Sequence, residues 1–345
     1  MPERVLLAGN NVRNVAESAR KAGYEVYAVT KFADADLSIY CASVFEVGDE
    51  LEDVKNTVQK VAEDVNAPVV LCSGFEGLKI NAELLCNEPN ERVVDKLKFY
   101  RELEKAGLPF PELLGKNEVG ILKPRRGGGG EEVAISSSDE EGFVKQRYIE
   151  GLPCSVSLIA HEGRAIPVAC NLIFAGWREM NASGFRYSGN LTPLTVSNDA
   201  REQLEKLAVE TVELFDLSGS VGVDFILADK PYILEVNPRF QGSLDSVEWS
   251  FDVNLFRMHA DAFRGRLPEK PTPKRYAIRA VLFSPRKLEI KISPAGNPFF
   301  ADVPRRGDVY HKDDPLVSIL AAGSDPEGVK KKILERKDVF LAMQG

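Results

Sequence analysis

Residues 221–239 read VGVDFILADKPYILEVNPR. Two alternating apolar runs flank the tetrapeptide ADKP, a pattern typical of a β-hairpin with a four-residue turn. If this turn sets the register so that Leu227 faces Tyr232, counting back by pairs places Asp224 opposite Glu235, with Cβ atoms about 5 Å apart. The stretch therefore predicts two carboxylates that face each other on one side of a sheet.

Facing carboxylates between apolar strands repel each other and lose hydration, so the pair is costly unless a cation lies between them. Mg²⁺ suits such a site because it takes hard oxygen ligands, typically one or two carboxylates with phosphates and water. Asn237 projects from the same face, two residues beyond Glu235, and offers a neutral oxygen. The alternative is an ordinary amphipathic hairpin, since a slip of one residue would move the carboxylates to opposite faces.

A second motif, ILKPRRGGGGEEVAI at residues 121–135, places Lys123 at the end of an expected strand, before two arginines and four glycines. Glycines allow backbone N–H groups to close over phosphate oxygens, and a lysine supplies charge to the α- and β-phosphates. The motif differs from the Walker A pattern GxxxxGK[ST]. A flexible hairpin loop is the alternative interpretation.

Apolar periodicity outside these motifs predicts an α/β and α+β chain of several domains. The start RVLLAG, an amphipathic stretch at 12–22 and YEVYAV form one βαβ unit, and a helix at 51–65 leads to the apolar run PVVLCSG, so we expect a parallel sheet. Further elements are expected as follows: a helix from residue 91 to about 108, antiparallel strands at GILKP, EEVAI, KQRYIEG, SVSLIAH and IPVACNLIF, a helix at 200–215, a proline-rich linker at 267–274, a strand at 276–283 and a terminal helix at 326–335.

Composition limits the classes of partner. The chain of 345 residues carries a formal net charge of -8, which argues against nucleic-acid and anionic-membrane binding because those proteins carry an excess of Lys and Arg. Its five cysteines lack CxxC spacing and lie mostly in apolar runs, as in a reduced protein. No apolar stretch approaches the roughly 20 residues of a membrane span, so a cytoplasmic location is expected.

The order of these motifs resembles the ATP-grasp superfamily, specifically its carboxylate-amine ligase and biotin-carboxylase-like branch, over about residues 3–262. Asp95-Lys96 matches the DK that begins the family's core, and Lys123 with Gly127, Gly128, Gly129 and Gly130 matches its phosphate lysine and glycine lid. The resemblance implies ATP and Mg²⁺ (or Mn²⁺) as cofactors. It also implies that Lys96, Lys123 and Arg239 surround the transferring phosphoryl group, and that Asp224, Glu235 and Asn237 hold the metal.

The resemblance further implies that QRYIEG is the family's hinge strand, whose backbone reads the adenine edge. Its nucleotide-binding residues would be Gln146, Arg147, Tyr148 and Ile149. Two positions depart from the family: relatives usually have Glu where this chain has Gln146, and many ligases have a ribose-binding acid at the position of Pro153. Without its neighbours, this segment would read as an ordinary strand.

Three domains follow from the resemblance: a Rossmann-like domain at 1–90, the ATP-grasp core at 91–265 with a glycine lid at about 118–145, and a C-terminal α+β region at 266–345 that packs on the core. The core is expected to consist of two antiparallel-sheet subdomains that clasp ATP. The acceptor site should lie between the core and the first domain, so Glu76, Arg186 and Gly242 are candidate substrate residues.

The implied activity is ATP-dependent phosphorylation of a small carboxylate, followed by attack of an amine or amino acid. The expected partners are these small molecules, and a homodimer is a further expectation. Two alternatives stay open: biotin-carboxylase-like activation of bicarbonate, and a nucleotide-binding protein that has lost turnover.

Overall fold

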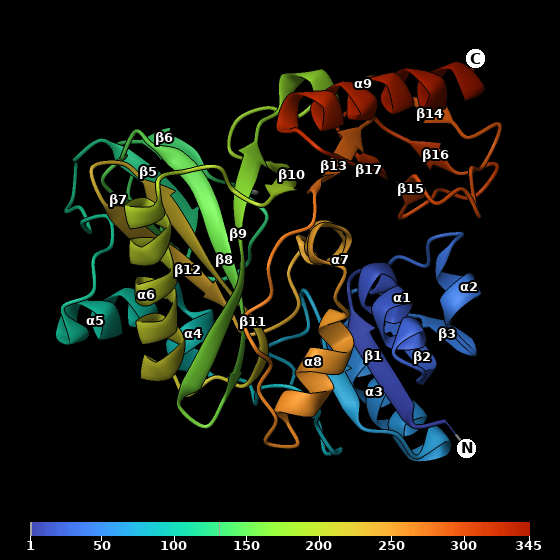
Figure 1. The fold of residues 1–345 in the computed structure, drawn as a ribbon, viewed down its shortest axis with the longest axis horizontal. Coiled ribbons are helices and arrows are strands. Elements are labelled where there is room, and N and C mark those ends of the chain that lie inside the picture. The colour runs from blue at the N-terminus through green and yellow to red at the C-terminus, as the bar shows by residue number, and fades with distance from the viewer. Residues whose placement is uncertain (1, 131) are drawn as a thin grey trace.

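The computed structural model describes residues 2–130 and 132–345, and its N-terminal part is a parallel sheet ordered β3–β2–β1–β4 (Figure 1). The central strands are mostly apolar and largely buried, as expected for strands covered on both faces. The strands are β1 Arg4–Gly9, β2 Glu25–Thr30, β3 Ser43–Glu46 and β4 Val69–Leu71, and the helices are α1 Arg13–Lys21, α2 Leu37–Tyr40 and α3 Leu51–Val65.

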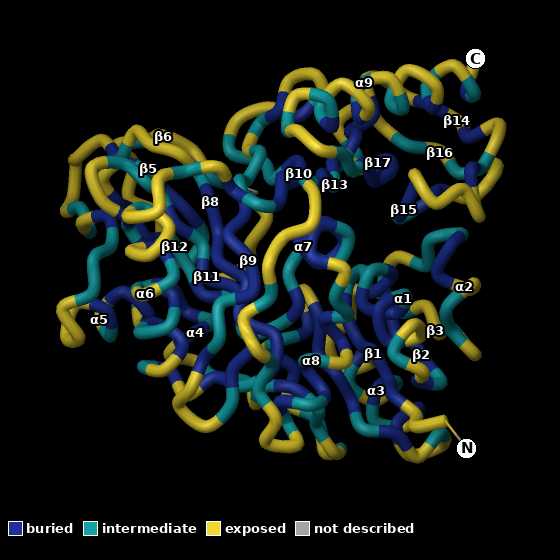
Figure 2. The backbone as a smooth tube through the Cα atoms, viewed as in Figure 1, coloured by how far each residue is buried: buried dark blue, intermediate teal, exposed yellow. Residues whose placement is uncertain are grey.

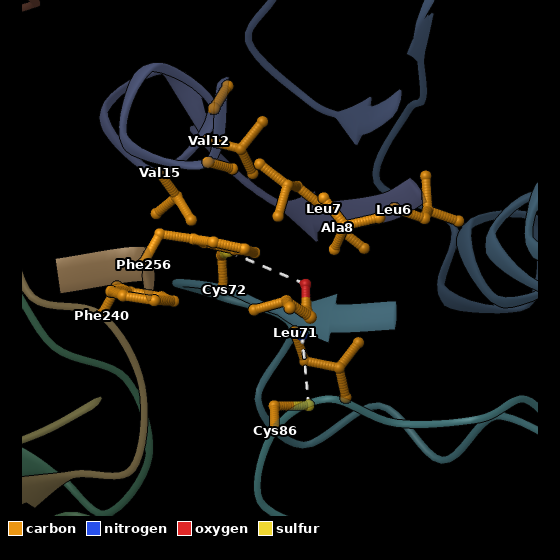
Figure 3. Packing of buried hydrophobic residues seen from close by; sticks show 14 of the residues in the cluster. Leu6, Leu7, Ala8, Val12, Val15, Leu71, Cys72, Cys86, Phe240 and Phe256 are labelled. Carbon is orange, nitrogen blue, oxygen red and sulfur yellow. Dashed lines mark hydrogen bonds between the residues drawn. The ribbon is translucent and has the colours of Figure 1, made fainter. Parts of the chain in front are cut away.

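The N-terminal core also receives two aromatic rings from the middle of the chain (Figure 3). Phe240 and Phe256 stack with ring centroids 5.9 Å apart, next to Leu7, Val15 and Cys72. Burial of two such rings anchors their segments firmly, since each ring buries a large apolar area. Phe240 follows Arg239 directly, so the N-terminal core fixes the backbone beside this arginine.

The largest sheet has eight strands in the order β12–β11–β8–β9–β10–β13–β17–β15, and its neighbouring strands pair antiparallel. Helix α6 packs on its β12–β9 part, while α7 and α8 lie between the sheet and the N-terminal part (Figure 1). The bounds are β8 Leu152–His161, β9 Arg164–Ala175, β10 Tyr187–Thr192, β11 Gly219–Leu227, β12 Pro231–Asn237, β13 Tyr276–Phe283, β15 Phe300–Ala301, β17 Pro315–Gly323, α6 Asn198–Leu214, α7 Leu244–Phe251 and α8 Leu255–Ala262.

A smaller sheet, ordered β6–β5–β7, carries Lys123 and the glycine loop (residues 127–130). Figure 2 shows that much of this region is exposed, in contrast to the dark strands β8 and β11. The remaining elements are α4 Glu91–Val94, α5 Lys96–Ala106, β5 Gly120–Pro124, β6 Ala134–Ser136, β7 Phe143–Gln146, the 3₁₀ turn Arg178–Met180, β14 Leu288–Glu289, β16 Val309–Tyr310 and α9 Pro326–Met343.

The predicted fold class, a parallel N-terminal sheet followed by antiparallel sheets, is confirmed. The division into three domains stays a prediction, although the large sheet runs on without interruption from β10 into β13, across the expected boundary at 266. Within the described residues, all five cysteines are free thiols, and no helix is long and apolar enough to cross a lipid bilayer.

Several element predictions were wrong in detail. KQRYIEG does not form one strand, because β7 ends at Gln146 and Arg147 donates its backbone N–H to Glu112 O (2.9 Å). The strand expected at 131–135 begins only at Ala134, and Glu131 lies outside the described residues. Helix α9 extends to Met343 because Ile333 and Phe340 stay buried against the sheet. Strands β10 and β17 and helices α7 and α8 were not predicted.

Candidate active site

The β11–β12 hairpin pairs Asp224 with Glu235, as the sequence predicts, although the pairing of Leu227 with Tyr232 was wrong. Near the turn Leu227 pairs with Pro231, and the register shifts by one residue between Asp224 and Phe225. This shift is a β-bulge at Leu234, which leaves one strand with an extra residue. The bulge restores the register that brings the two carboxylates face to face.

Two contacts outside the hairpin hold this bulge. The buried Tyr100 hydroxyl donates a hydrogen bond to Leu234 O (2.5 Å), and the backbone N–H of Ile233 donates to Pro109 O (2.9 Å). Because an extra strand residue lacks a ladder partner, these bonds satisfy backbone groups that would otherwise be orphaned. Helix α5 and the segment after it therefore fix the position of Glu235.

The carboxylate pair is electrostatically strained without a cation. Burial, followed by the facing Glu235 carboxylate, raises the pKa of Asp224 well above its usual range. Burial alone would also raise the pKa of Glu235, but Lys96, Lys123 and Arg239 hold it below its usual value. Without a cation, the pair therefore favours a proton on Asp224 over a second negative charge.

Asn237 lies beside both acids. Its amide nitrogen is 3.4 Å from Asp224 Oδ2 and 3.5 Å from Glu235 Oε1. Rotation of the amide would turn Oδ1 toward the same space, so two carboxylates and one amide oxygen are available as hard ligands. Among the described residues no group of three or more His, Cys, Asp or Glu could hold a metal ion, and phosphates and water would have to complete the coordination of a cation here.

Lys96 and Lys123 approach these acids from a helix and a strand. Lys96, the first residue of α5, lies 3.6 Å from Glu235 Oε2 and donates to Gly127 O (2.5 Å). Lys123 in β5 has its Nζ 5.0 Å from the centroid of the Tyr100 ring. Burial, with a contribution from Lys96, lowers the pKa of Lys123 to about 7, against the opposing effect of Glu235. An anion bound beside these amines would favour the charged form of Lys123.

Asp95 explains how Lys96 is held. Its carboxylate caps α5 by accepting from the backbone N–H groups of Leu97 (3.0 Å) and Lys98 (3.3 Å), and it also pairs with the Arg125 guanidinium (2.5 Å). The backbone N–H of Lys96 in turn donates to Arg125 O (2.8 Å). Asp95 therefore joins the start of the helix to the strand that carries Lys123.

Arg239 lies at the junction with the N-terminal sheet. Its Nε is 3.1 Å from Glu76 Oε1, and its Nη1 donates to Phe240 O (3.0 Å). Both side chains are largely buried, and Glu76 Oε2 is buried without a hydrogen-bond partner. The structure thus brings Glu76 to Arg239, which stands close enough to the metal candidates to stabilise the charge on Glu235.

The other two substrate candidates contact different parts of the chain. Arg186 places its guanidinium 5.0 Å from the Phe283 ring centroid and donates to Asp313 O (2.6 Å), so it contacts the C-terminal region. A Cβ on Gly242 would lie 2.9 Å from the Tyr187 hydroxyl, so a side chain there would have to displace the Tyr187 ring. The substrate roles of Glu76, Arg186 and Gly242 stay predictions.

The expected hinge lies between the two antiparallel sheets. Gln146 is buried and its amide donates to Pro111 O (2.9 Å), while Arg147 pairs with Glu112 (2.5 Å). The next residues, Tyr148 and Ile149, leave the strand, and Tyr148 is 52% exposed. A backbone free of ladder bonds can offer its polar groups to a base, and adenine reading at this hinge stays a prediction.

Three residues that support the site were not singled out from the sequence in that role: Tyr100, which holds the bulge, Asp95, which ties Lys96 to Arg125, and Tyr187, which contacts the glycine loop. Tyr100 shows only helical spacing, as any core residue does. Asp95 carries a recognisable signal, an acid at the start of a helix. Tyr187 carries none, because its partner is 58 residues away in the chain.

Known proteins match this arrangement. A model of the ATP-grasp domain matches residues 93–243. An uncharacterized protein of Methanocaldococcus jannaschii is 26% identical over 356 aligned residues, covering 92% of this chain and 88% of that protein. The D-alanine–D-alanine ligase of Thermosipho melanesiensis is 23% identical, covering 61% of this chain and 63% of that protein.

The fold also matches solved structures. Biotin carboxylase from Campylobacter jejuni superposes with a TM-score of 0.76 at 16% identity, covering 96% of this chain and 90% of that one. The matched domain spans Lys96, Lys123, the glycine loop and the carboxylate hairpin. Residues 93–243 thus match the ATP-grasp domain, and the fold of the chain as a whole is similar to that of biotin carboxylase.

Proposed function

We propose that this protein is an ATP-dependent ligase that phosphorylates the carboxylate of a small acid and joins the resulting acyl phosphate to an amine, releasing ADP and phosphate. The observation that carries this proposal is the facing pair Asp224 and Glu235, with Asn237 beside them and three cationic side chains around them. Neighbouring acids and cations of this kind suit a bound metal–phosphate complex.

The chain's own groups would act mainly by position and charge. Lys96, Lys123 and Arg239 would neutralise the phosphoryl oxygens as a carboxylate oxygen bonds to the γ-phosphorus and the bond to ADP breaks. Bound Mg²⁺, held by Asp224, Glu235 and Asn237, would supply further neutralisation of phosphate charge. The amine nitrogen then bonds to the acyl carbon, the carbon–oxygen bond to phosphate breaks, and the nitrogen loses a proton.

This sequence moves one carboxylate oxygen into the released phosphate. The experiment incubates the protein with MgATP, amines and a pool of acids labelled with oxygen-18 in their carboxylates. Mass spectrometry identifies a condensed product, and ³¹P NMR detects labelled phosphate. Product formed with unlabelled phosphate, or with AMP and pyrophosphate, would contradict the acyl-phosphate route.

Two further arms separate the alternatives. One arm replaces the acids with bicarbonate and biotin, and the other contains ATP alone. ADP release that depends on bicarbonate and biotin would favour carboxylase chemistry. Tight ATP binding without ADP release in any arm would favour a protein that binds the nucleotide and has lost turnover.

A further inference from the structure

The glycine loop rests on a segment that is distant in the sequence. Gly129 O accepts a hydrogen bond from the backbone N–H of Tyr187 (2.9 Å), at the first residue of β10. A Cβ on Gly130 would lie only 2.0 Å from Phe185 O, and Gly130 has a φ of 74°, in the left-handed region. This contact joins backbone to backbone, and a side chain at residue 130 would prevent it.

The receiving segment, residues 183–187, has a defined shape of its own. The backbone N–H of Gly176 donates to Arg186 O (2.8 Å), and that of Arg186 lies 3.4 Å from Ser183 O. The Tyr187 hydroxyl donates to Asn190 Oδ1 (3.0 Å), which fixes the side chain at the foot of the segment. The segment is therefore held from both ends, as a docking surface for a loop must be.

Arg186 ties this segment to the C-terminal region. Its Nη1 donates to Asp313 O (2.6 Å), and its guanidinium lies 5.0 Å from the Phe283 ring centroid. Nearby, the Asn181 amide donates to Phe283 O (2.9 Å). One arginine thus joins the segment to two separate parts of the C-terminal region.

On its other side the glycine loop is held at Gly127, whose carbonyl accepts from Lys96 Nζ (2.5 Å) beside Glu235. The loop therefore runs from the carboxylate pair to the 183–187 segment. Closure of such a loop excludes water from the phosphates, and water would otherwise hydrolyse an acyl phosphate.

We propose that residues 183–187 are the docking site of the closed glycine loop, and that Arg186 is a positioning residue that holds this site through Phe283 and Asp313. This role is distinct from the substrate contact expected from the sequence, which stays a prediction. The inference rests on the proposed function, because it assigns the docked loop to the nucleotide-bound enzyme. It also assigns a role to the C-terminal region, which would hold the docking segment in place while the loop closes.

The test follows the Tyr187 amide, which is hydrogen-bonded to Gly129 O only when the loop is docked. Amide hydrogen exchange is measured on the full chain with Mg²⁺ and a non-hydrolysable ATP analogue, and calorimetry gives the affinity for the analogue. The variants are Arg186→Ala, Arg186→Lys and Gly130→Ala. Arg178→Ala, which removes an exposed arginine of the same β9–β10 connection, is the matched control.

We expect the analogue to protect this amide in the wild type and in Arg178→Ala. In Arg186→Ala the protection falls by about tenfold, while melting temperature and analogue affinity stay near wild type. In Gly130→Ala the protection falls at least as far, because the added Cβ would clash with Phe185 O. Arg186→Lys restores part of the protection, because a lysine can still donate to Asp313 O. A loss of amide protection at unchanged melting temperature and analogue affinity distinguishes a docking role from a general loss of stability.

Full protection in Arg186→Ala or Gly130→Ala would overturn the inference, as would an unprotected Tyr187 amide in the wild type with bound analogue. An equal loss of Tyr187 amide protection in Arg178→Ala would show that the effect is not specific to Arg186, and would also overturn the inference. Failure of the wild type to bind the analogue at all would instead contradict the proposed function.

Discussion

Charge balance at single residues decides what the site can bind. Asp224 and Glu235 are half-buried and face each other across the β11–β12 ladder, and cations approach them from α5, β5 and the segment after β12. Two neighbouring carboxylates strongly disfavour ionisation of both groups at once. A cation between them removes this electrostatic cost. Burial and the neighbouring Lys96 lower the pKa of Lys123 to about 7, against the opposing effect of Glu235 and Asp224.

Glu248 shows a raised pKa away from this site. It lies in α7 and accepts hydrogen bonds from Ser18 Oγ (2.5 Å) and from the backbone N–H of Leu255 (2.7 Å). Burial raises its pKa from 4.5 to about 7, against the lowering effect of these two hydrogen bonds, and Asp245 adds a smaller upward contribution. The folded protein therefore binds a proton at Glu248 more tightly than the unfolded chain does.

Glu248→Gln should remove a pH dependence from the free energy of unfolding. Between about pH 4.5 and pH 7 the folded state holds the extra proton, so the wild type loses stability relative to the variant as the pH rises, by roughly 3 kcal/mol in total. Urea unfolding at several pH values measures this difference. A difference that stays constant over this range would show that Glu248 titrates normally.

At the scale of elements, the β-bulge at Leu234 decides which residues face each other. A regular ladder continued from the observed turn would pair Asp224 with Leu234 and move Glu235 out of register. Tyr100 and Pro109 hold the extra residue from outside the sheet. The geometry of the carboxylate hairpin therefore depends on α5, which also supplies Lys96.

Tyr100→Phe should lower the free energy of unfolding by about 1–3 kcal/mol, because it leaves Leu234 O buried without its donor. Denaturant unfolding measures the loss. Tyr232→Phe is the control, since it removes an exposed hydroxyl contact with Asp229 in the same hairpin. Equal stability of the two variants would mean that the Tyr100 bond does not support the bulge.

Local patterns predicted these elements well where one face is apolar. Helix α3 has the predicted bounds because Val54, Val58 and Val61 mark its buried side. The Asp224–Glu235 pairing was predicted from a turn register that was wrong by one residue, and the bulge offsets that difference. The bulge could not be predicted, because its cause is a tyrosine more than a hundred residues away. Strand β10 was missed because it begins in a polar stretch whose partners, β9 and β13, supply its apolar environment.

At the scale of the whole molecule, a buried charge cluster joins the parts of the chain. Arg13 in α1 is 1% exposed and pairs with Asp245 in α7 (2.6 Å) and with Asp302 after β15 (3.1 Å). Arg279 in β13 also pairs with Asp302 (2.7 Å), and Asp36 accepts from the backbone N–H of Val303 (2.9 Å). These contacts connect residues up to 289 positions apart, which no local sequence pattern encodes.

Arg13→Met should therefore destabilise the whole protein. Removal of one partner leaves buried carboxylates without compensation, and the expected loss in the free energy of unfolding is about 3–5 kcal/mol. Arg20→Met, at an exposed position of the same helix, should change it by less than about 0.5 kcal/mol. Thermal and urea unfolding compare them, and similar values for both variants would show that the cluster does not hold the molecule together.

The measurement that tests the account most directly is Mn²⁺ binding in place of Mg²⁺, followed by electron paramagnetic resonance with a non-hydrolysable ATP analogue. Wild type and Asp229→Asn, which changes an exposed acid of the same hairpin, should bind Mn²⁺ together with the nucleotide. Glu235→Gln should weaken Mn²⁺ binding by about tenfold or more, since it removes one of two carboxylate ligands. Equal Mn²⁺ affinity in Glu235→Gln and wild type would contradict the assignment of the facing carboxylates as the metal site.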